Sequence, residues 1–381
     1  MVALKSKGRI PARDLLHYET SFDWRKALED GTEAVSAPCR VDMGGTIDIR
    51  TFSYPLQHLG PCTVNIALDL RTTVRIGPYT RGRVKVSSRG FTSAEFSAGH
   101  APFRHSLGLM FATAAFFHAQ GVHIHVESDS PPRSALGGSS AAAAALVRAF
   151  MEVRQRDGLA ASVDGRSIAL MAHAIEESVA GVPCGYQDQL AAVYGGVNAW
   201  HWLAPPGRQV YRREALVSSR SLRRLEPHLL VAYVGVPHES SDINGRWVQQ
   251  FVSGKYRREW ADIVGCTRRF AGFLRRREYS AAAAVMNREM DIRRRMTPDV
   301  LDRLGAKLTA AARRQGCGAR ITGAGGGGCL WAIGEADVVV RLKPLWLQIM
   351  AERKEARLLE VKMAGQGLRV EDEDRAQKSA D

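Results

Sequence analysis

The chain has 381 residues, a length typical of two domains, and its hydrophobic fraction of 45% and charged fraction of 24% exclude a mainly disordered or collagen-like protein. It contains neither an apolar stretch of about 18 residues nor the apolar core of a secretory signal, so we expect a cytoplasmic protein with no membrane partner. The 53 lysine and arginine residues exceed the 39 aspartate and glutamate residues, and the formal net charge of +14 favours anionic partners such as nucleotides, sugar phosphates or nucleic acid.

The first half of the chain has the patterns of a mixed α and β domain. Residues 1–30 are expected to form a polar lead with a short helix. Alternating apolar residues from Val35 to Val86 and over 122–129 predict strands. The segments 106–121 and 166–180 predict helices.

The second half begins after a boundary expected at the proline- and glycine-containing residues 205–207. We predict a buried strand over 225–237, helices over 241–314 with a break at 296–298, and a glycine-rich loop leading to a strand over 319–333. The apolar-poor end of the chain predicts a frayed tail. The expected domains are residues 1–207 and 208–365, followed by a charged tail over 366–381.

A glycine- and serine-rich loop runs directly into an alanine-rich helix. Gly137, Gly138, Ser139 and Ser140 precede the segment that begins at Ala141. The first N–H groups of a helix lack partners inside it, and the helix dipole places partial positive charge there. The spacing therefore predicts an anion-binding cradle, with a serine hydroxyl available to Mg²⁺. A serine-capped helix packed closely for steric reasons stays open as the alternative.

Three further segments contain residues suited to phosphoryl transfer. Residues 323–328 are almost all glycine, which favours close approach to a phosphate or to another backbone over a flexible linker. Glu176 and Asp188 form a carboxylate pair that could hold Mg²⁺ and orient a hydroxyl, although spacing alone favours two ordinary helix-end acids. Arg40 could stabilise charge at a reacting centre and Asp48 could bind sugar hydroxyls, the alternative being an ordinary strand and turn.

Other candidate sites are weaker. The six cysteines are scattered without a CxxC pair, which predicts reduced and mostly buried thiols, and Cys184 has no evident base to activate it. His123 and His125 have no third metal ligand placed by the sequence. Short arginine clusters such as 293–295 are interpreted as solvated surfaces, and without a zinc-finger spacing or an RNA-binding signature we predict no nucleic-acid partner.

Three of these segments resemble the three motifs of the GHMP kinase superfamily, in the same order. They are APCRVDMGGTID at 37–48, PPRSALGGSSAAA at 131–143 and ITGAGGGGCL at 321–330. The resemblance spans about residues 35–335. GYQDQLAAVYGG at 185–196 is most similar to the sugar-kinase branch that includes D-glycero-D-manno-heptose 7-phosphate kinase.

The resemblance implies roles for individual residues. Asp188 would be the catalytic aspartate, with Arg40 near the transferred phosphoryl group, and Ser139 and Glu176 would bind Mg²⁺. The residues implied for the nucleotide are Pro132, Gly137, Gly138, Ser139, Ser140 and Ala141. Those implied for the acceptor are Thr46, Asp48, Gly185, Gln187, Gly325 and Gly326. Arg133, Ala135 and Gly138 stand where the superfamily more often has glycine, glycine and serine.

The resemblance also implies the fold and the reaction. We expect a two-domain α+β fold, with a first domain like the second domain of ribosomal protein S5 and a ferredoxin-like second domain. The activity implied is ATP- and Mg²⁺-dependent phosphorylation of a hydroxyl, preferably the anomeric one, of a sugar or sugar phosphate resembling heptose 7-phosphate. The alternatives are a mevalonate- or homoserine-type kinase, an inactive nucleotide-binding regulator and a basic nucleic-acid-binding module. The expected partner is a small-molecule substrate, and a homodimer is left open.

Overall fold

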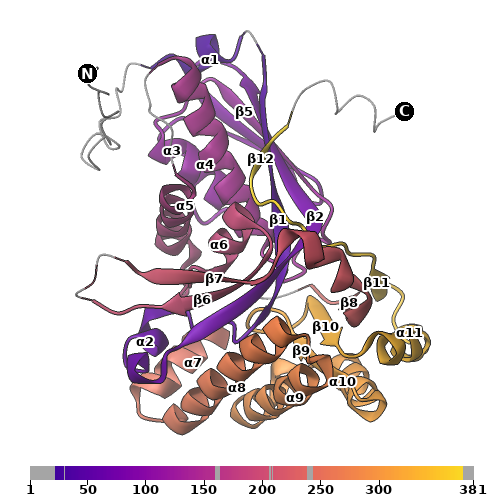
Figure 1. Ribbon diagram of the computed structural model, residues 1–381. Helices are drawn as coiled ribbons and strands as arrows, with labels where there is room; N and C mark the ends of the chain where they lie inside the picture. The colour runs from indigo at the N-terminus through magenta and orange to yellow at the C-terminus, as the bar shows by residue number, and fades with distance from the viewer. Residues whose placement is uncertain are drawn as a thin grey trace, which may run out of the picture.

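The protein is built from two β-sheets, each packed against helices (Figure 1). The computed structural model describes residues 22–29, 31–158, 164–205, 207, 209–237 and 243–371. An eight-stranded sheet belongs to the first half of the chain and a four-stranded sheet to the second half. This arrangement confirms the predicted α+β fold class.

Two long antiparallel strands form the centre of the first sheet. β1 (Glu33–Met43) is almost wholly buried and pairs with β2 (Cys62–Pro78), with a register shift between Pro38 and Cys39. The remaining strands extend the sheet on both sides of this pair. They are β3 (Arg83–Ser88), β4 (Ala94–Ser97), β5 (Val122–Ser128), β6 (Val197–Trp202), β7 (Tyr211–Val217) and β12 (Arg369–Val370).

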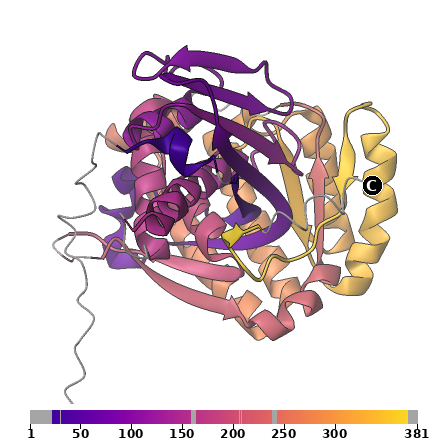
Figure 2. The same ribbon diagram turned by 90° about the horizontal axis from the view of Figure 1, so that it is seen from above.

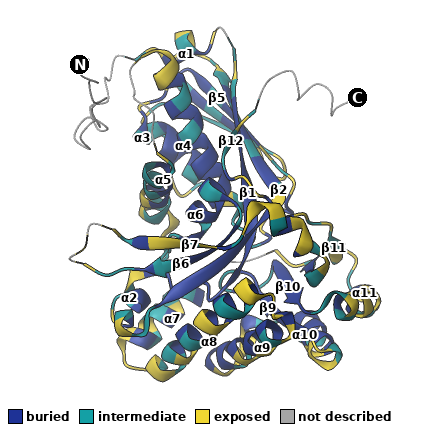
Figure 3. Ribbon diagram, viewed as in Figure 1, coloured by how far each residue is buried: buried dark blue, intermediate teal, exposed yellow. Residues whose placement is uncertain are grey.

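Helices cover one face of this sheet. They are α3 (Gly108–Phe116), α4 (Gly138–Arg156), α5 (Gly165–Ala180) and α6 (Gln187–Tyr194). α4 contacts β1 and β2 on one side and α3, α5 and α6 on the other. The five alanines at 141–145 are buried, and their small side chains let α4 approach the sheet closely (Figure 3). α1 (Trp24–Ala27) closes one end, where the Trp24 ring meets the Phe150 ring at 4.9 Å between centroids.

The second half builds the four-stranded antiparallel sheet. Its strands, in spatial order, are β11 (Arg357–Leu359), β8 (Leu229–Tyr233), β10 (Cys329–Ile333) and β9 (Gly318–Ile321). The longer helices of this half are α7 (Ile243–Val252), α8 (Arg257–Arg276), α9 (Tyr279–Met296), α10 (Arg303–Gln315) and α11 (Ala336–Met350). The short helical segments of this half are η3 (Ser219–Arg224), η4 (Glu226–His228) and η5 (Pro298–Val300), and those of the first half are α2 (Arg50–Ser53) and η2 (Gln57–Leu59). α9 packs on β9 and runs beside α8.

The chain crosses between the two sheets at places other than those expected. β7 pairs with β6, so the first sheet continues past residue 207, which falls inside the β6–β7 hairpin. Beyond β11 the chain returns to the first sheet, where β12 pairs with β1 (Figure 2). Residues 366–371, assigned to the tail by the sequence, therefore belong to a folded edge. Residues 372–381 and 1–21 lie outside the described part.

In the part of the chain that the structure describes, the helices are either too short or too polar to cross a membrane.

A substitution at Gly318 tests the close packing of α9 on β9. A Cβ at this position would lie 2.5 Å from the Ala283 carbonyl oxygen and 2.7 Å from its Cα. Backbone atoms cannot move aside cheaply, so Gly318→Ala should lower the free energy of unfolding by about 2 kcal/mol. The measurement is urea unfolding followed by circular dichroism.

Gly265 is the matched control. It lies inside α8, and a Cβ there would meet no described atom within 4 Å. Gly265→Ala should therefore raise the free energy of unfolding by about 0.5–1 kcal/mol through helix propensity. Equal effects of the two substitutions would contradict the packing described for Gly318.

Candidate active site

The N-terminus of α4 opens directly onto the loop that precedes it. Gly137 occupies the cap position with φ of 77° and has no side chain to cap the helix. The first intrahelical bond runs from the Ala141 N–H to the Gly137 carbonyl at 2.9 Å. The N–H groups of Gly138, Ser139 and Ser140 therefore precede that bond and, with the helix dipole, could bind an anion.

Ala141 and Pro132 do not extend this donor set. The Ala141 side chain is buried and its N–H is used within the helix, so Ala141 packs α4 against the sheet and offers no free donor. Pro132 is exposed, and its ring packs against Gly90, where an added Cβ would lie 3.0 Å from Pro132 Cγ. Proline has no N–H, so Pro132 could offer a ligand its carbonyl oxygen or an apolar ring contact but no backbone donor.

The loop before α4 holds two non-glycine residues in a left-handed backbone conformation. Arg133 has φ of 54° and Ala135 has φ of 59°. The resemblance noted in the sequence places glycine more often at both positions, and the positive φ values are a physical reason for such a preference. A side chain in this region costs about 1 kcal/mol, which glycine avoids.

Arg40 joins this loop to α6. Its Nε and Nη2 donate to the two carboxylate oxygens of Asp188, both at 2.8 Å, and its Nη1 donates to the Ala135 carbonyl at 2.7 Å. Burial works against the charged guanidinium, yet Asp188 and Asp42 raise the pKa of Arg40. A Cβ on Gly137 would lie 3.4 Å from Asp188 Oδ2. The predicted catalytic pair thus lies beside the helix N-terminus.

Glu176 of α5 gathers the serines that begin α4. Its Oε2 accepts from Ser140 Oγ at 2.7 Å and from Gln189 Nε2 at 2.6 Å, while Oε1 accepts from Ser139 Oγ at 3.4 Å. Burial and then the charge of Asp188 raise the pKa of Glu176 to about 7. These are oxygen ligands of the kind that Mg²⁺ prefers.

A metal ion here would depend on more than protein carboxylates and imidazoles. Within the described ranges, groups of three or more His, Cys, Asp or Glu side chains arranged to hold a metal do not occur. The hydroxyls of Ser139 and Ser140, waters and phosphate oxygens would have to complete the shell around Glu176. Mg²⁺ fits this requirement because it usually keeps several waters and binds through one or two carboxylates plus phosphates.

Asp48 lies at the end of the turn that follows β1. It is 2% exposed, and its Oδ2 accepts from the Gln187 N–H at 2.9 Å. Its Oδ1 has no hydrogen-bond partner among the described residues. A Cβ on Gly185 would lie 1.9 Å from Oδ2, so only glycine fits there. Burial and then the charges of Asp188 and Asp42 raise the pKa of Asp48 to about 7.

The predicted acceptor residues are brought together only in part. Thr46, with φ of 74°, Gly185 and Gln187 all lie around Asp48 or on its turn. Gly325 and Gly326 instead contact the core of the second half. A Cβ on Gly325 would lie 2.7 Å from Val300 Cγ2, and the Gly326 N–H donates to the Val300 carbonyl.

The glycine-rich loop approaches the site at its two ends. Gly323 donates its N–H to Asp42 Oδ1 at 2.7 Å, and a Cβ on it would be 3.7 Å from Arg40 Nη2. A Cβ on Gly328 would lie 2.5 Å from the Ser134 carbonyl oxygen. The expected close approach is therefore between two backbones, this loop and the loop before α4.

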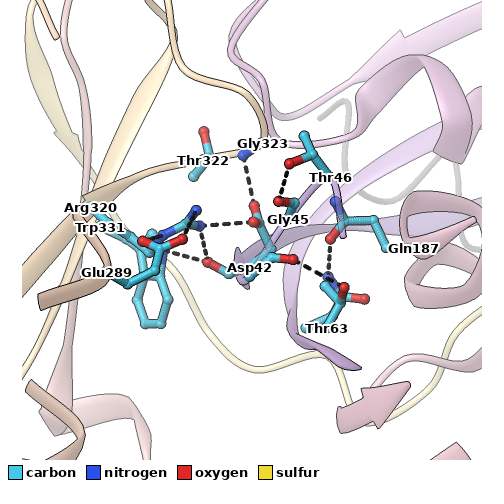
Figure 4. A network of polar contacts seen from close by, with 12 residues as sticks. Asp42, Gly45, Thr46, Thr63, Gln187, Glu289, Arg320, Thr322, Gly323 and Trp331 are labelled. Atoms are coloured by element: carbon cyan, nitrogen blue, oxygen red, sulfur yellow. Dashed lines mark hydrogen bonds and ion pairs between the residues drawn. The ribbon is translucent and has the colours of Figure 1, made fainter. Parts of the chain in front are cut away.

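Sequence reasoning missed a buried charge network beneath the site (Figure 4). It consists of Asp42, Glu289, Arg293 and Arg320, whose side chains are 0% exposed. The interpretation of 293–295 as a solvated cluster is wrong for Arg293, because α9 turns that side chain inward. Asp42 could have been found from its spacing, since it lies two residues after Arg40 on one strand and so shares its face.

Cys184 has the environment of an inert thiol. Burial, followed by the charges of Glu176 and Asp188, raises its pKa to about 12. A thiolate is the reactive form of cysteine. The structure thus agrees with the low expectation for Cys184 as a nucleophile.

The chain is similar in sequence to known kinases. Residues 105–196 match the family model described as the GHMP kinases N-terminal domain. The chain is 23% identical over 315 residues to the mevalonate kinase of Thermococcus sibiricus, covering 74% of this chain and 87% of that protein. It is 29% identical over 120 residues to the D-glycero-alpha-D-manno-heptose 7-phosphate kinase of Campylobacter jejuni, covering 32% of this chain and 33% of that protein.

The fold is also found among solved structures. The crystal structure of a D-glycero-D-manno-heptose 1-phosphate kinase from Bacteroides thetaiotaomicron matches with a TM-score of 0.65 at 16% identity, covering 89% of this chain and 99% of that chain.

Asp48 should make stability depend on pH. Its pKa is raised to about 7 from an ordinary 3.8, so between these values the folded protein keeps a proton that the unfolded chain releases. The free energy of unfolding should therefore fall as pH rises through this window. Asparagine does not titrate, so Asp48→Asn removes this pH-dependent fall. Between pH 4 and pH 8 the free energy of unfolding of the variant should rise relative to that of wild type by on the order of 1–3 kcal/mol. Urea unfolding at both pH values measures this gain, and an unchanged difference would contradict the environment described for Asp48.

Proposed function

We propose that this chain, which carries the N-terminal domain of the GHMP kinases, transfers the γ-phosphate of ATP to a hydroxyl group of a sugar or sugar phosphate. The coarser statement, a kinase acting on sugars or small alcohols, follows from the family match and the relatives. The observation that supports the finer one most directly is the bidentate Arg40–Asp188 pair beside the N-terminus of α4, at 2.8 Å for both bonds.

The nucleotide phosphates would bind at the start of α4. Gly138, Ser139 and Ser140 supply unpaired helix N–H groups, and Gly137 keeps the cap free of a side chain. Ser139 and Glu176 would hold Mg²⁺, which when bound neutralises phosphate charge and orients the phosphates. This assignment rests on the hydroxyl and carboxylate oxygens already gathered at Glu176.

Asp188 would orient the attacking hydroxyl. Arg40 occupies part of its hydrogen-bonding capacity, and each carboxylate oxygen keeps a further lone pair for a hydroxyl proton. Arg40 itself lies between Asp188 and the Ala135 carbonyl, which places its positive charge between the acceptor and the phosphate loop. Such a charge stabilises the transferring phosphoryl group, and positioning dominates this chemistry.

The acceptor is proposed to be a polyol. The Asp48 Oδ1 atom is buried without a partner among the described residues and would accept a hydrogen bond from a substrate hydroxyl. A heptose 7-phosphate, phosphorylated at its anomeric hydroxyl, is the first acceptor to test. Heptose-phosphate kinases occur among the relatives in both sequence and structure, and the net charge of +14 suits a phosphorylated substrate.

Mevalonate is the second candidate. The mevalonate kinase relative aligns over 74% of this chain, far more than the heptose 7-phosphate kinase does. An inactive nucleotide-binding regulator is less well supported, because Arg40 is paired with Asp188 and Glu176 bonds Ser140 at the start of α4.

An ADP-release assay over a panel of acceptors tests the proposal. The panel contains D-glycero-D-manno-heptose 7-phosphate, galactose, fucose, glucuronate and mevalonate. We expect the highest kcat/KM with the heptose phosphate. Turnover of mevalonate alone would replace the sugar proposal with its alternative, and ATP binding without turnover of any acceptor would favour the regulator.

Asp188→Asn should separate binding from transfer. The amide keeps the shape but cannot accept the hydroxyl proton in the same way, so kcat should fall by roughly 10³-fold or more. The Kd for ATP, measured by calorimetry, should stay within about threefold of wild type. Asp69→Asn, at a side chain that is 45% exposed, is the control and should leave kcat unchanged. A kcat near wild type for Asp188→Asn would exclude Asp188 from catalysis.

Glu176→Gln tests the proposed metal site. Loss of the carboxylate charge should raise the Mg²⁺ concentration needed for half-maximal activity by about tenfold, or roughly 1.4 kcal/mol. Glu177→Gln is the matched control, because Glu177 pairs with Arg50 at the surface and makes no contact with Ser139 or Ser140. If both variants reached half-maximal activity at the same Mg²⁺ concentration, Glu176 would not be a metal ligand.

A further inference from the structure

Six charged side chains form a chain of alternating sign that runs from the site into the second half of the protein. Arg40 Nη1 lies 3.4 Å from Asp42 Oδ1, and Asp42 Oδ2 accepts from Arg320 Nη1 at 2.8 Å. Glu289 accepts from Arg320 Nε at 3.3 Å and from Arg293 Nε. In order, the members are Asp188, Arg40, Asp42, Arg320, Glu289 and Arg293. Figure 4 shows its central part, Asp42, Arg320 and Glu289.

Stability alone does not explain this chain of ion pairs. Removing a charge from water costs several kcal/mol per ion, and apolar side chains of similar volume often stabilise a core equally well. Four of the six groups are fully buried. The groups at the two ends of this chain of ion pairs therefore indicate what it does. One end is Asp188 in the candidate active site.

The other end holds the turn that carries Asp48. Arg293 Nη2 donates to the Gly45 carbonyl at 2.7 Å, and its Nη1 lies 3.4 Å from Thr46 Oγ1. Thr46 has φ of 74°, a conformation that a β-branched residue adopts only when its surroundings impose it. Both ends of this chain of ion pairs, Asp188 and Arg293, thus lie at the proposed acceptor site.

α8 fixes the start of the same turn. A Cβ on Gly44 would lie 2.2 Å from Thr267 Oγ1, so the backbone packs directly on the helix. The turn over residues 44–48 is therefore held by two helices of the second half, α8 through packing and α9 through Arg293.

We propose that Arg293 is a positioning residue for the acceptor, which acts by holding the turn of residues 44–48 so that Asp48 faces the substrate. The inference rests on the proposed function for the identity of the acceptor, but the holding of the turn does not. If Arg293 served only to neutralise Glu289, the conformation of the turn would not depend on its two contacts with Gly45 and Thr46.

Arg293→Lys separates these roles. Lysine keeps a positive charge beside Glu289, but its single ammonium cannot span Glu289 and the Gly45 carbonyl as the guanidinium does. We expect amide hydrogen exchange in residues 44–48, followed by mass spectrometry, to accelerate by about tenfold or more. The KM for the best acceptor of the panel should rise by about tenfold, while the KM for ATP stays within about twofold.

Arg71→Lys is the matched control. Arg71 is also a buried arginine that donates to backbone carbonyls, those of Ser36 at 3.0 Å and Gly367 at 2.6 Å. Its substitution should lower Tm yet leave exchange in residues 44–48 and the acceptor KM unchanged. Thr46→Gly is a second variant that leaves every buried charge in place. It should reproduce the faster exchange and the raised acceptor KM at near-normal stability, even if Arg293→Lys does not fold.

The outcomes are distinguishable. Wild-type exchange rates at 44–48 in Arg293→Lys, or in Thr46→Gly if the first variant does not fold, would overturn the positioning role. So would equal rises in the KM for acceptor and for ATP. Absence of turnover with every acceptor would overturn the proposed function, while the exchange rates would still decide the role of Arg293.

Discussion

The site depends on one buried guanidinium. Arg40 enters from a central strand and meets Asp188 of α6, the Ala135 carbonyl of the loop before α4, and Asp42 of its own strand. These segments lie far apart in the sequence, and Arg40 is the group common to them. A buried guanidinium without these partners would be costly. The packing of α4 and α6 against the first sheet therefore brings the residues of the site together.

Close backbone packing is the second constraint. The loop before α4 and the glycine-rich loop of the second half touch through Gly328 and the Ser134 carbonyl, and Gly185 lies against the Asp48 carboxylate. Neither contact leaves room for a side chain. The segments at 131–143 and 321–330 thus combine free N–H groups at the start of α4 with glycines that let three loops converge, and close packing also explains Gly325, which contacts Val300.

Local patterns predicted much of the fold. The helix expected over 166–180 is α5, which begins after its Asp164 cap, and the break expected at 296–298 is the end of α9. The pairing of β12 with β1 could not be predicted, because it joins strands at opposite ends of the described chain, whereas β6 and β7 form a local hairpin whose turn was interpreted as a domain boundary. Arg293 was misassigned for the same reason. Its neighbours Arg294 and Arg295 are exposed, and only the packing of α9 decides which arginine faces inward.

The return of the chain to β1 through β12 has a mechanical consequence. The two halves are joined by two covalent connections, one between β7 and β8 and the other between β11 and β12. Two covalent connections limit how far the halves can separate more than a single connection would. Any rotation of one half against the other would then have to carry both connections with it.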